Sequence, residues 1–251
     1  MLRPVKKEYG QHFLVDENIL GVVGRLAELA PEDVVLEIGP GQGVLTRYLA
    51  ERVRRVYAVE IDRELEPALR DIANVELRFG DALELELPQD VAKLVSNLPY
   101  NVATPILVES LDGLPNVRLW CVMVQREVAD RLFAEPGTKA YGAVSVLVQL
   151  VCERTGFHPV SRTVFRPRPN VDSALVAFRR VGLPADYARV KRVVTASFAH
   201  RRKTLPNSLA LTGLAPRAAA AAALESIGRG ATTRAEALAP LEFLALAEAL
   251  R

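Results

Sequence analysis

The sequence contains few of the residues that build disulfide frameworks and transition-metal sites. It has two cysteines and three histidines in 251 residues, and neither cysteine has the spacing of a metal ligand or a disulfide partner. Cys121 and Cys152 both lie in apolar runs, which indicates reduced thiols in a core. His12, His158 and His200 are scattered along the chain, so we expect no bound metal.

Long apolar runs are also missing. No run approaches the roughly 20 residues that cross a bilayer, and the first ten residues, MLRPVKKEYG, contain no apolar block of the kind that a secretory signal needs. We therefore expect a cytoplasmic protein without a membrane partner. Half of the residues are nevertheless hydrophobic and a quarter are charged, which suffices for one good core and a smaller second one.

The net charge is only +2, but the two signs are segregated along the chain. Residues 32–90 hold fourteen acidic and seven basic side chains, a net charge of −7, whereas residues 154–203 hold twelve basic and two acidic ones, a net charge of +10. Single scattered arginines are usually solvated surface charges. A basic excess of this size over fifty residues is instead typical of a surface that binds a phosphate backbone, and it favours a nucleic acid as the partner.

Short apolar runs rich in β-branched residues predict five strands, at residues 34–39, 55–60, 75–80, 93–97 and 118–124. Helix-like segments lie between most of these runs, which indicates a mostly parallel sheet covered on both faces. Two further runs, at 156–160 and 173–181, are joined by the proline-rich loop RPRPNVDS, which leaves no room for a crossover helix. We expect them to form an antiparallel hairpin at one edge, which completes a seven-stranded sheet.

The composition changes after Gly182 and Pro184. From there to Arg251 the sequence is rich in alanine and leucine at helical spacing, and the alanine run at 218–223 is strongly helix-forming. We therefore predict an α/β domain over residues 1–182 and a small helical domain over residues 183–251.

The stretch EIGPGQGVLT, residues 37–46, joins the end of the first predicted strand to an apolar helix. Its glycines, Gly39, Gly41 and Gly43, allow the backbone to pass close to a ligand at the carboxyl end of the sheet. A dinucleotide fingerprint needs its third glycine one residue later, where this chain has Val44. An adenosyl cofactor without a pyrophosphate fits better.

Acidic residues stand at the ends of the next two predicted strands. Glu60 follows Gly43 by 17 residues, and a carboxylate there can accept hydrogen bonds from both hydroxyls of a ribose. Asp81, in FGDAL, can accept from an adenine amine. Alone, each of these acids reads equally well as a solvated charge or a helix N-cap. Together with the glycine loop, and in this order, they predict a pocket for S-adenosylmethionine.

The fourth predicted strand, KLVSN, runs into NLPYN beside that pocket. Without context the stretch reads as a turn in which Pro99 keeps Leu98 extended and Tyr100 covers the core. Beside a methyl donor it fits methylation of an exocyclic amine. The side-chain oxygen of Asn97 and a backbone carbonyl at Leu98 or Pro99 can accept both N–H hydrogens, and stacking of the base on Tyr100 is worth about 1–3 kcal/mol. Catalysis then depends on positioning, and the base must be flipped out to enter.

EIGPGQGVLT, Glu60, Asp81 and NLPYN together resemble the adenine-N6 dimethyltransferases of ribosomal RNA. Further segments extend the resemblance from residue 9 to about residue 236: GQHFL at 10–14, RPRPNVDSA at 166–174 and FAHRRKTLPNSL at 198–209. The glycine loop is common to many methyltransferases, whereas NLPYN with RRKT in one chain is far more specific. The match is to the KsgA type, which acts on the small ribosomal subunit, rather than to the Erm type, which acts on large-subunit RNA.

The resemblance implies a Rossmann-like methyltransferase fold and a set of site residues. Those that it assigns to the cofactor are His12, Leu14, Gly39, Gly41, Glu60, Ile61, Asp81, Ala82 and Asn97. Those that it assigns to the catalytic site are Asn97, Leu98, Pro99, Tyr100 and Phe165. Those that it assigns to RNA are Arg166, Arg168, Arg201, Arg202 and Lys203.

Two of these positions carry competing interpretations. Phe165 would sandwich the target adenine against Tyr100 by resemblance, but by itself it reads as a core residue of an edge strand. The family usually has Gln-Asn-Phe where this chain has Gln11, His12 and Phe13. A backbone contact to the cofactor is therefore implied at residue 12, and a role for its side chain is not.

The implied function is transfer of four methyl groups from S-adenosylmethionine to two adjacent adenosines near the 3′ end of 16S rRNA, in an assembling small subunit, by a monomeric enzyme. The alternatives are an Erm-type large-subunit enzyme, a DNA adenine methylase that shares the Asn-x-Pro-aromatic pattern, and a non-catalytic ribosome assembly factor. Intact Asn97, Tyr100, Glu60 and glycine loop argue against the last, because binding alone does not need them.

Overall fold

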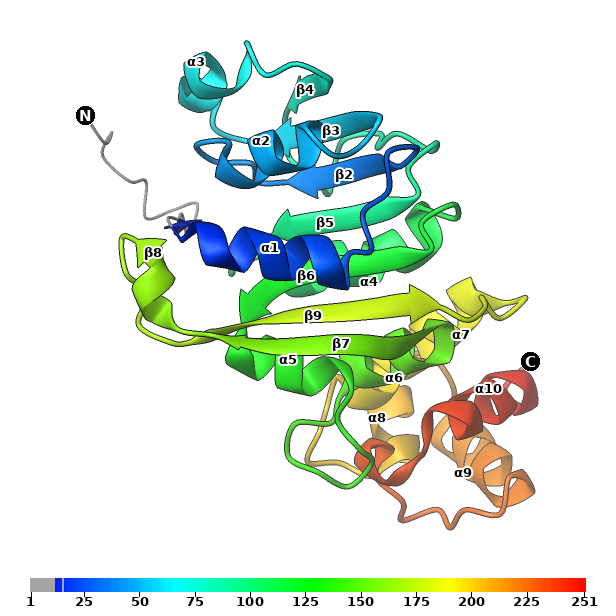
Figure 1. Cartoon of the computed structure of the whole chain (residues 1–251). Coiled ribbons are helices and arrows are strands. Elements are labelled where there is room, and N and C mark those ends of the chain that lie inside the picture. The colour runs from blue at the N-terminus through cyan, green and yellow to red at the C-terminus, as the bar shows by residue number, and fades with distance from the viewer. Residues whose placement is uncertain (1–11, 15) are drawn as a thin grey trace. The chain divides into compact units, whose positions relative to one another are not determined.

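A computed structural model describes residues 12–14 and 16–251 of the chain, with the elements arranged as in Figure 1. The chain divides into two compact units. The first contains the described residues up to Ala129 together with Glu153–Arg180, and the second contains Asp130–Cys152 and Val181–Arg251. No helix in the described part of the chain is long and apolar enough to cross a bilayer.

A seven-stranded sheet forms the centre of the first unit, in the order β4-β3-β2-β5-β6-β9-β7 (Figure 1). Its strands are β2 (Val34–Ile38), β3 (Arg55–Glu60), β4 (Val75–Phe79), β5 (Lys93–Asn97), β6 (Leu119–Gln125), β7 (Cys152–Val160) and β9 (Ser173–Arg180). The first five pair in parallel, and β9 runs antiparallel to β6. The α/β fold with a mostly parallel seven-stranded sheet, as predicted, is confirmed.

The helices of this unit cover both faces of the sheet. They are α1 (Glu17–Leu26), α2 (Val44–Ala50), the short α3 (Glu66–Leu69), α4 (Ala103–Gly113) and α5 (Arg126–Leu132), which crosses into the second unit. Apolar side chains of α1 and α2 pack with Val95 and Cys121 in one cluster. Trp120, which precedes Cys121 on β6, donates to Ser110 of α4 at 2.9 Å, so α4 covers the opposite face.

A second, two-stranded sheet lies beside the first unit's core. Strand β1 (Phe13–Leu14) pairs antiparallel with β8 (Phe165–Arg166), so that Leu14 is opposite Phe165 (Figure 1). The sequence pattern did not predict this pairing, since two residues are too few to show a period. The pairing brings residue 12 next to the RPRP loop.

The second unit is helical. Its elements are α6 (Ala143–Val151), α7 (Tyr187–Phe198), α8 (Leu205–Leu211), α9 (Arg217–Ser226), the short 3-10 turn η4 (Ala235–Ala237) and α10 (Pro240–Ala249). Phe198 of α7 contacts the rings of Tyr141 and Phe243, with centroids 5.9 and 5.8 Å away. The Tyr141 hydroxyl also donates to the Leu238 carbonyl at 2.8 Å. Residues 130–152 thus pack with the C-terminal helices, whereas the sequence pattern places them in the α/β domain because they precede its last two strands.

Both cysteines are buried, and neither forms a disulfide bond. Burial raises the pKa of Cys121 to about 12, which keeps the thiol protonated at neutral pH. The expectation of reduced cysteines in a core is therefore met.

Candidate functional site

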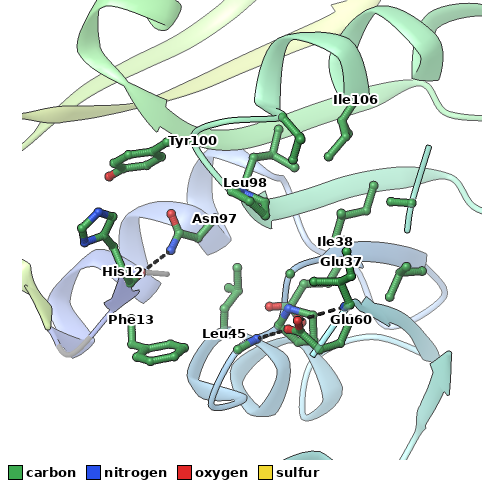
Figure 2. Close-up of a pocket in the computed structure, with 18 of the residues that line it drawn as sticks. His12, Phe13, Glu37, Ile38, Leu45, Glu60, Asn97, Leu98, Tyr100 and Ile106 are labelled. Atoms are coloured by element: carbon green, nitrogen blue, oxygen red, sulfur yellow. Dashed lines mark hydrogen bonds between the residues drawn. The ribbon is translucent and has the colours of Figure 1, made fainter. Parts of the chain in front are cut away.

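A pocket opens at the carboxyl ends of the parallel strands in the first unit, where ligands bind in sheets of this kind. Every residue that the resemblance assigns to the cofactor lines it: His12, Leu14, Gly39, Gly41, Glu60, Ile61, Asp81, Ala82 and Asn97. So do Leu98, Pro99 and Tyr100. Figure 2 shows His12, Asn97 and Tyr100 together on one side of the pocket, with Glu37 and Glu60 on the other.

The glycine loop between β2 and α2 is bent in a way that requires glycine. Gly39, Gly41 and Gly43 have φ angles of 77°, 58° and 78°, in the left-handed region. A Cβ on Gly41 would also lie 2.9 Å from the Phe13 ring, and one on Gly39 would lie 3.1 Å from Pro99. The loop therefore forms a tight backbone wall under the NLPY stretch, as close approach to a ligand requires.

Glu60, the last residue of β3, anchors this loop. One carboxylate oxygen accepts from the Gly41 amide at 3.0 Å, and the other accepts from the amides of Ile61 and Asp62 at 2.9 and 3.0 Å. Burial raises the pKa of Glu60, and these three amide hydrogen bonds act in the opposite direction. The carboxylate is thus held rigidly at the pocket wall, with lone pairs beyond those three bonds that can accept from a diol.

Glu37 lies across the pocket from Asn97 and Tyr100 (Figure 2). It is not among the site residues expected from the sequence. Its carboxyl group is buried, and its Oε2 has no hydrogen-bond partner among the described residues. Burial raises its pKa to about 8, the Thr46 hydroxyl lowers it, and the negative charge of Glu60 raises it further. An acid inside an otherwise apolar strand, directly before the glycine loop, is the sequence signal that points to it.

The end of β4 supplies the remaining wall. Asp81 accepts from the Leu83 amide at 2.9 Å, which is the capping contact that the sequence allows. Asp81 and Ala82 nonetheless line the pocket together with Ile61, whose side chain is 45% exposed. An exposed apolar side chain next to a carboxylate forms a surface on which a flat, amine-bearing ring can lie.

Asn97, the last residue of β5, has an oriented amide. Its Nδ2 donates to the main-chain carbonyl of His12 at 3.0 Å, which fixes which end of the amide is the oxygen (Figure 2). Its Oδ1 is buried and has no partner among the described residues. The Leu98 amide donates to the Met123 carbonyl at 3.0 Å, which holds the turn after β5 against β6.

Tyr100 is held by contacts from two distant segments. Its hydroxyl lies 2.5 Å from the Ser173 hydroxyl at the start of β9, and burial raises its pKa. The His12 ring lies against it with centroids 5.3 Å apart and planes tilted by 33°. The Nδ1 of His12 is in turn 2.9 Å from the Pro167 carbonyl.

Phe165 is not among the residues that line the pocket, and the adenine sandwich that resemblance implies for it stays a prediction. Its ring is fully buried in the cluster that contains Leu14, and it does not line the pocket. The reason is the alternation of β8: Phe165 points into the core and Arg166 points to solvent. Its interpretation as an edge-strand core residue matches the structure better.

The basic residues that resemblance assigns to RNA binding differ in the contacts that they make within the protein. Arg166 is exposed at the end of β8, Arg168 is exposed in the loop that follows, and Arg202 and Lys203 are exposed after α7, with no ion pair described for any of the four. Arg201 instead donates to two carbonyls in the second unit, at 2.9 and 3.3 Å, and lies 3.9 Å from Glu236. Its guanidinium is largely committed to holding the loop before α6.

Part of the predicted N-terminal motif, at residues 10 and 11, lies outside the described residues. Within the described ranges, no three side chains of histidine, cysteine, aspartate or glutamate are grouped as a metal site.

The whole chain matches known proteins. A family model described as ribosomal RNA adenine dimethylase matches residues 3–251. The ribosomal RNA small subunit methyltransferase A of Rubrobacter xylanophilus is 46% identical in an alignment 250 residues long that covers 96% of this chain and 93% of that protein. The protein of the same name from Lactiplantibacillus plantarum is 44% identical over 98% of this chain and 90% of its own length.

Solved structures share the fold. A dimethyladenosine transferase from Plasmodium falciparum superposes with a TM-score of 0.79 at 24% identity, over 94% of this chain and 96% of that one. The 23S rRNA methyltransferase ErmE superposes with a TM-score of 0.65 at 31% identity, over 95% of this chain and 99% of that one. The α/β methyltransferase fold with a helical C-terminal part is common to them.

Proposed function

The chain belongs to the ribosomal RNA adenine dimethylase family, and from that premise we propose that it uses S-adenosylmethionine to dimethylate N6 of two adjacent adenosines near the 3′ end of 16S rRNA. The target is an assembling small subunit. The curated relatives at 42–46% identity are named for the small subunit, whereas the large-subunit enzyme ErmE is 31% identical, which supports the small subunit over the large one.

The unpartnered oxygen of Asn97 is the observation that carries the chemistry. A buried acceptor left without a hydrogen bond costs about 1–3 kcal/mol, so it is maintained where a ligand supplies the donor. The amine of adenine carries two N–H donors. The Pro99 carbonyl already accepts from the Val102 amide at 3.1 Å, so the carbonyl of Leu98 is the better second acceptor. Two acceptors on one amine favour a tetrahedral nitrogen whose lone pair is free to attack.

The pocket fits an adenosyl cofactor. The left-handed glycine loop, the carboxylate of Glu60 and the exposed apolar side chain of Ile61 are the parts that such a molecule needs. The cofactor brings an already activated sulfonium methyl group. The protein itself then only has to bind, orient and exclude water, and no strong base is required.

The same two acceptors account for a second transfer and for release. After one methylation the amine, having lost a proton, retains one N–H, which Asn97 can still accept. After the second it retains none, so the product no longer satisfies the Asn97 oxygen and binds more weakly than the substrate. Dimethylation is therefore the natural end point of this site.

The exposed cations Arg166, Arg168, Arg202 and Lys203 are proposed to contact RNA phosphates. Each carries a positive charge, and no ion pair within the described part of the chain involves it. Such contacts position an RNA without reading its sequence, so the choice of adenosines depends on the folded subunit. We further propose that the enzyme acts as a monomer in the cytoplasm, where small subunits assemble.

The test uses labelled S-adenosylmethionine with small subunits that lack the modification, with large-subunit RNA and with duplex DNA, followed by mass spectrometry of the digested nucleosides. We expect N6,N6-dimethyladenosine in small-subunit RNA alone. Label in large-subunit RNA alone would assign the protein to the Erm type, and label in DNA alone would make it a DNA methylase. Tight subunit binding without any transfer would make it an assembly factor.

A further inference from the structure

The glycine loop is held by two side chains, and only one of them lines the pocket. Glu60, which does, accepts from the Gly41 amide at 3.0 Å. Arg47 of α2, which does not, donates from Nη2 to the carbonyl of the next loop residue, Gln42, at 2.6 Å. Its Nη1 donates to the Ala68 carbonyl of α3 at 3.1 Å. One guanidinium therefore joins the glycine loop to α3.

The loop also packs closely against α3 where Arg47 joins the two. A Cβ on Gly43 would lie 3.0 Å from the Leu69 side chain and 3.1 Å from that of Ile72. It would also lie 3.1 Å from Nη1 of Arg47. Helix α3 has four residues, too few to be stable alone, so its position depends on contacts such as these.

The segment that leads into α3 forms part of the pocket wall. It leaves β3 at Glu60, continues through Ile61 and reaches α3 through the 3-10 turn η2 (Arg63–Leu65). Glu60 and Ile61 line the pocket, and so does Gln42 of the glycine loop. Arg47 thus connects, from outside the pocket, two of the segments that line it.

A planar guanidinium that donates to two main-chain carbonyls holds them at a fixed separation. We propose that Arg47 is a positioning residue for the cofactor: it sets the distance between the glycine loop and the segment after β3, and through that distance the affinity for S-adenosylmethionine. This inference rests on the proposed function, because it requires an adenosyl cofactor in the pocket.

Two substitutions at Arg47 and one elsewhere on the same helix separate this role from general support of α2. Arg47→Met keeps an apolar stem and loses both hydrogen bonds, and Arg47→Lys keeps the charge without the planar fork that reaches two carbonyls. Arg52→Met is the matched control. Arg52 follows α2, is exposed, and donates to the Tyr48 carbonyl at 2.8 Å and to the Glu51 carboxylate at 3.0 Å. It does not line the cofactor pocket.

The measurements are the Kd for S-adenosylmethionine by titration calorimetry, kcat and cofactor KM on unmodified small subunits, and hydrogen exchange of the loop amides without cofactor. In Arg47→Met we expect Kd and KM to rise about tenfold, the loss of two exposed hydrogen bonds that each contribute a few-fold. The kcat at saturating cofactor should stay within about twofold, because Arg47 does not contact the reacting groups. The amides of residues 41–43 should exchange faster.

The other two variants complete the expected pattern. Arg47→Lys should raise Kd about threefold, since it retains one of the two hydrogen bonds. Arg52→Met should leave Kd, KM, kcat and the exchange of the loop amides as they are in the unmodified enzyme.

The possible results separate this inference from the proposed function. An unchanged Kd in Arg47→Met, or a fall in kcat at unchanged KM, would overturn the positioning role and leave the function in place. An equal rise of Kd in Arg52→Met would also overturn it, because weakening of α2 would then explain both. Where Arg47→Met does not fold, the Kd of Arg47→Lys decides: a threefold rise supports the role and no change refutes it. Absence of S-adenosylmethionine binding and of methyl transfer in the unmodified enzyme would refute the function together with the inference.

Discussion

Glu37 should make the free energy of unfolding of this protein depend on pH. Its pKa is about 8 in the folded protein, against 4.5 for an unburied glutamate, because burial opposes its ionisation. Below the lower value the carboxyl is neutral in both states and costs nothing. As the pH rises from 4.5 to about 8, the unfolded chain releases a proton that the folded chain retains. The folded state therefore loses stability until the carboxyl ionises in the fold as well.

The size of this loss in the free energy of unfolding follows from the difference between the two pKa values. Each unit of pKa corresponds to about 1.4 kcal/mol, so the free energy of unfolding should fall by about 1.4 kcal/mol per pH unit, and by roughly 5 kcal/mol over the whole range. Glu37→Gln removes the titration and keeps the size and shape of the side chain. All other titrating groups are common to both proteins and cancel to first order in their difference.

The assay is urea unfolding of both proteins from about pH 5 to about pH 8, followed by tryptophan fluorescence. Trp120 is the sole tryptophan of the chain and lies fully buried in β6, so its signal reports the first unit. The Glu37→Gln protein should gain stability relative to the parent with every step upward in pH. Two parallel pH profiles would refute the reasoning, since they would show that Glu37 is ionised throughout.

Further substitutions, at Glu60, Tyr100, Arg202, Lys203 and Arg201, test other parts of the protein. Glu60→Gln should weaken S-adenosylmethionine at least tenfold in calorimetry, because its amide group would face backbone N–H donors; an unchanged Kd would contradict the anchoring role. Tyr100→Phe should retain kcat/KM within a few-fold and Tyr100→Ala should lose about tenfold or more, whereas equal losses would argue against stacking. Arg202→Ala and Lys203→Ala should each reduce the slope of log RNA affinity against log salt by about one. Arg201→Ala should instead lower the melting temperature, because Arg201 holds two backbone carbonyls, and a pure salt effect there would contradict that assignment.

The central strands could be predicted because their residues are buried on both faces. Val34–Ile38 is buried throughout, and such a strand reads as a continuous apolar run. The glycine loop, Glu60, Asp81 and NLPYN could be placed for a related reason. Each lies at or just after the end of a parallel strand, and all parallel strands end at the same edge of the sheet.

The contacts that shape the base side of the pocket could not be predicted in the same way. Tyr100 is held by Ser173, and the loop at Pro167 is held by His12, across 73 and 155 positions of the sequence. A periodic pattern in the local sequence does not reveal contacts between residues so far apart. Phe165 shows the same limit, since a two-residue strand has too little pattern to reveal which of its side chains points inward.

The domain boundary illustrates a further limit. Residues 130–152 precede the last two strands of the sheet, so their order along the chain suggests the α/β domain. Their apolar faces and Tyr141 nevertheless pack with the C-terminal helices. Composition identifies a buried helix but does not identify which of two cores buries it.

In the proposed reaction, the Asn97 oxygen is the acceptor that prepares an adenine amine for methyl transfer. The most direct test is a single-turnover measurement of N6-methyladenosine and N6,N6-dimethyladenosine formation on unmodified small subunits by the unmodified enzyme, Asn97→Ala and Asn116→Ala. Asn116 is an exposed asparagine of the same unit that donates to the Gln89 carbonyl at 2.8 Å, well separated in sequence from the NLPYN stretch. We expect no detectable product with Asn97→Ala and normal product with Asn116→Ala, with both variants folded. Normal dimethylation by Asn97→Ala would contradict this role of the Asn97 oxygen.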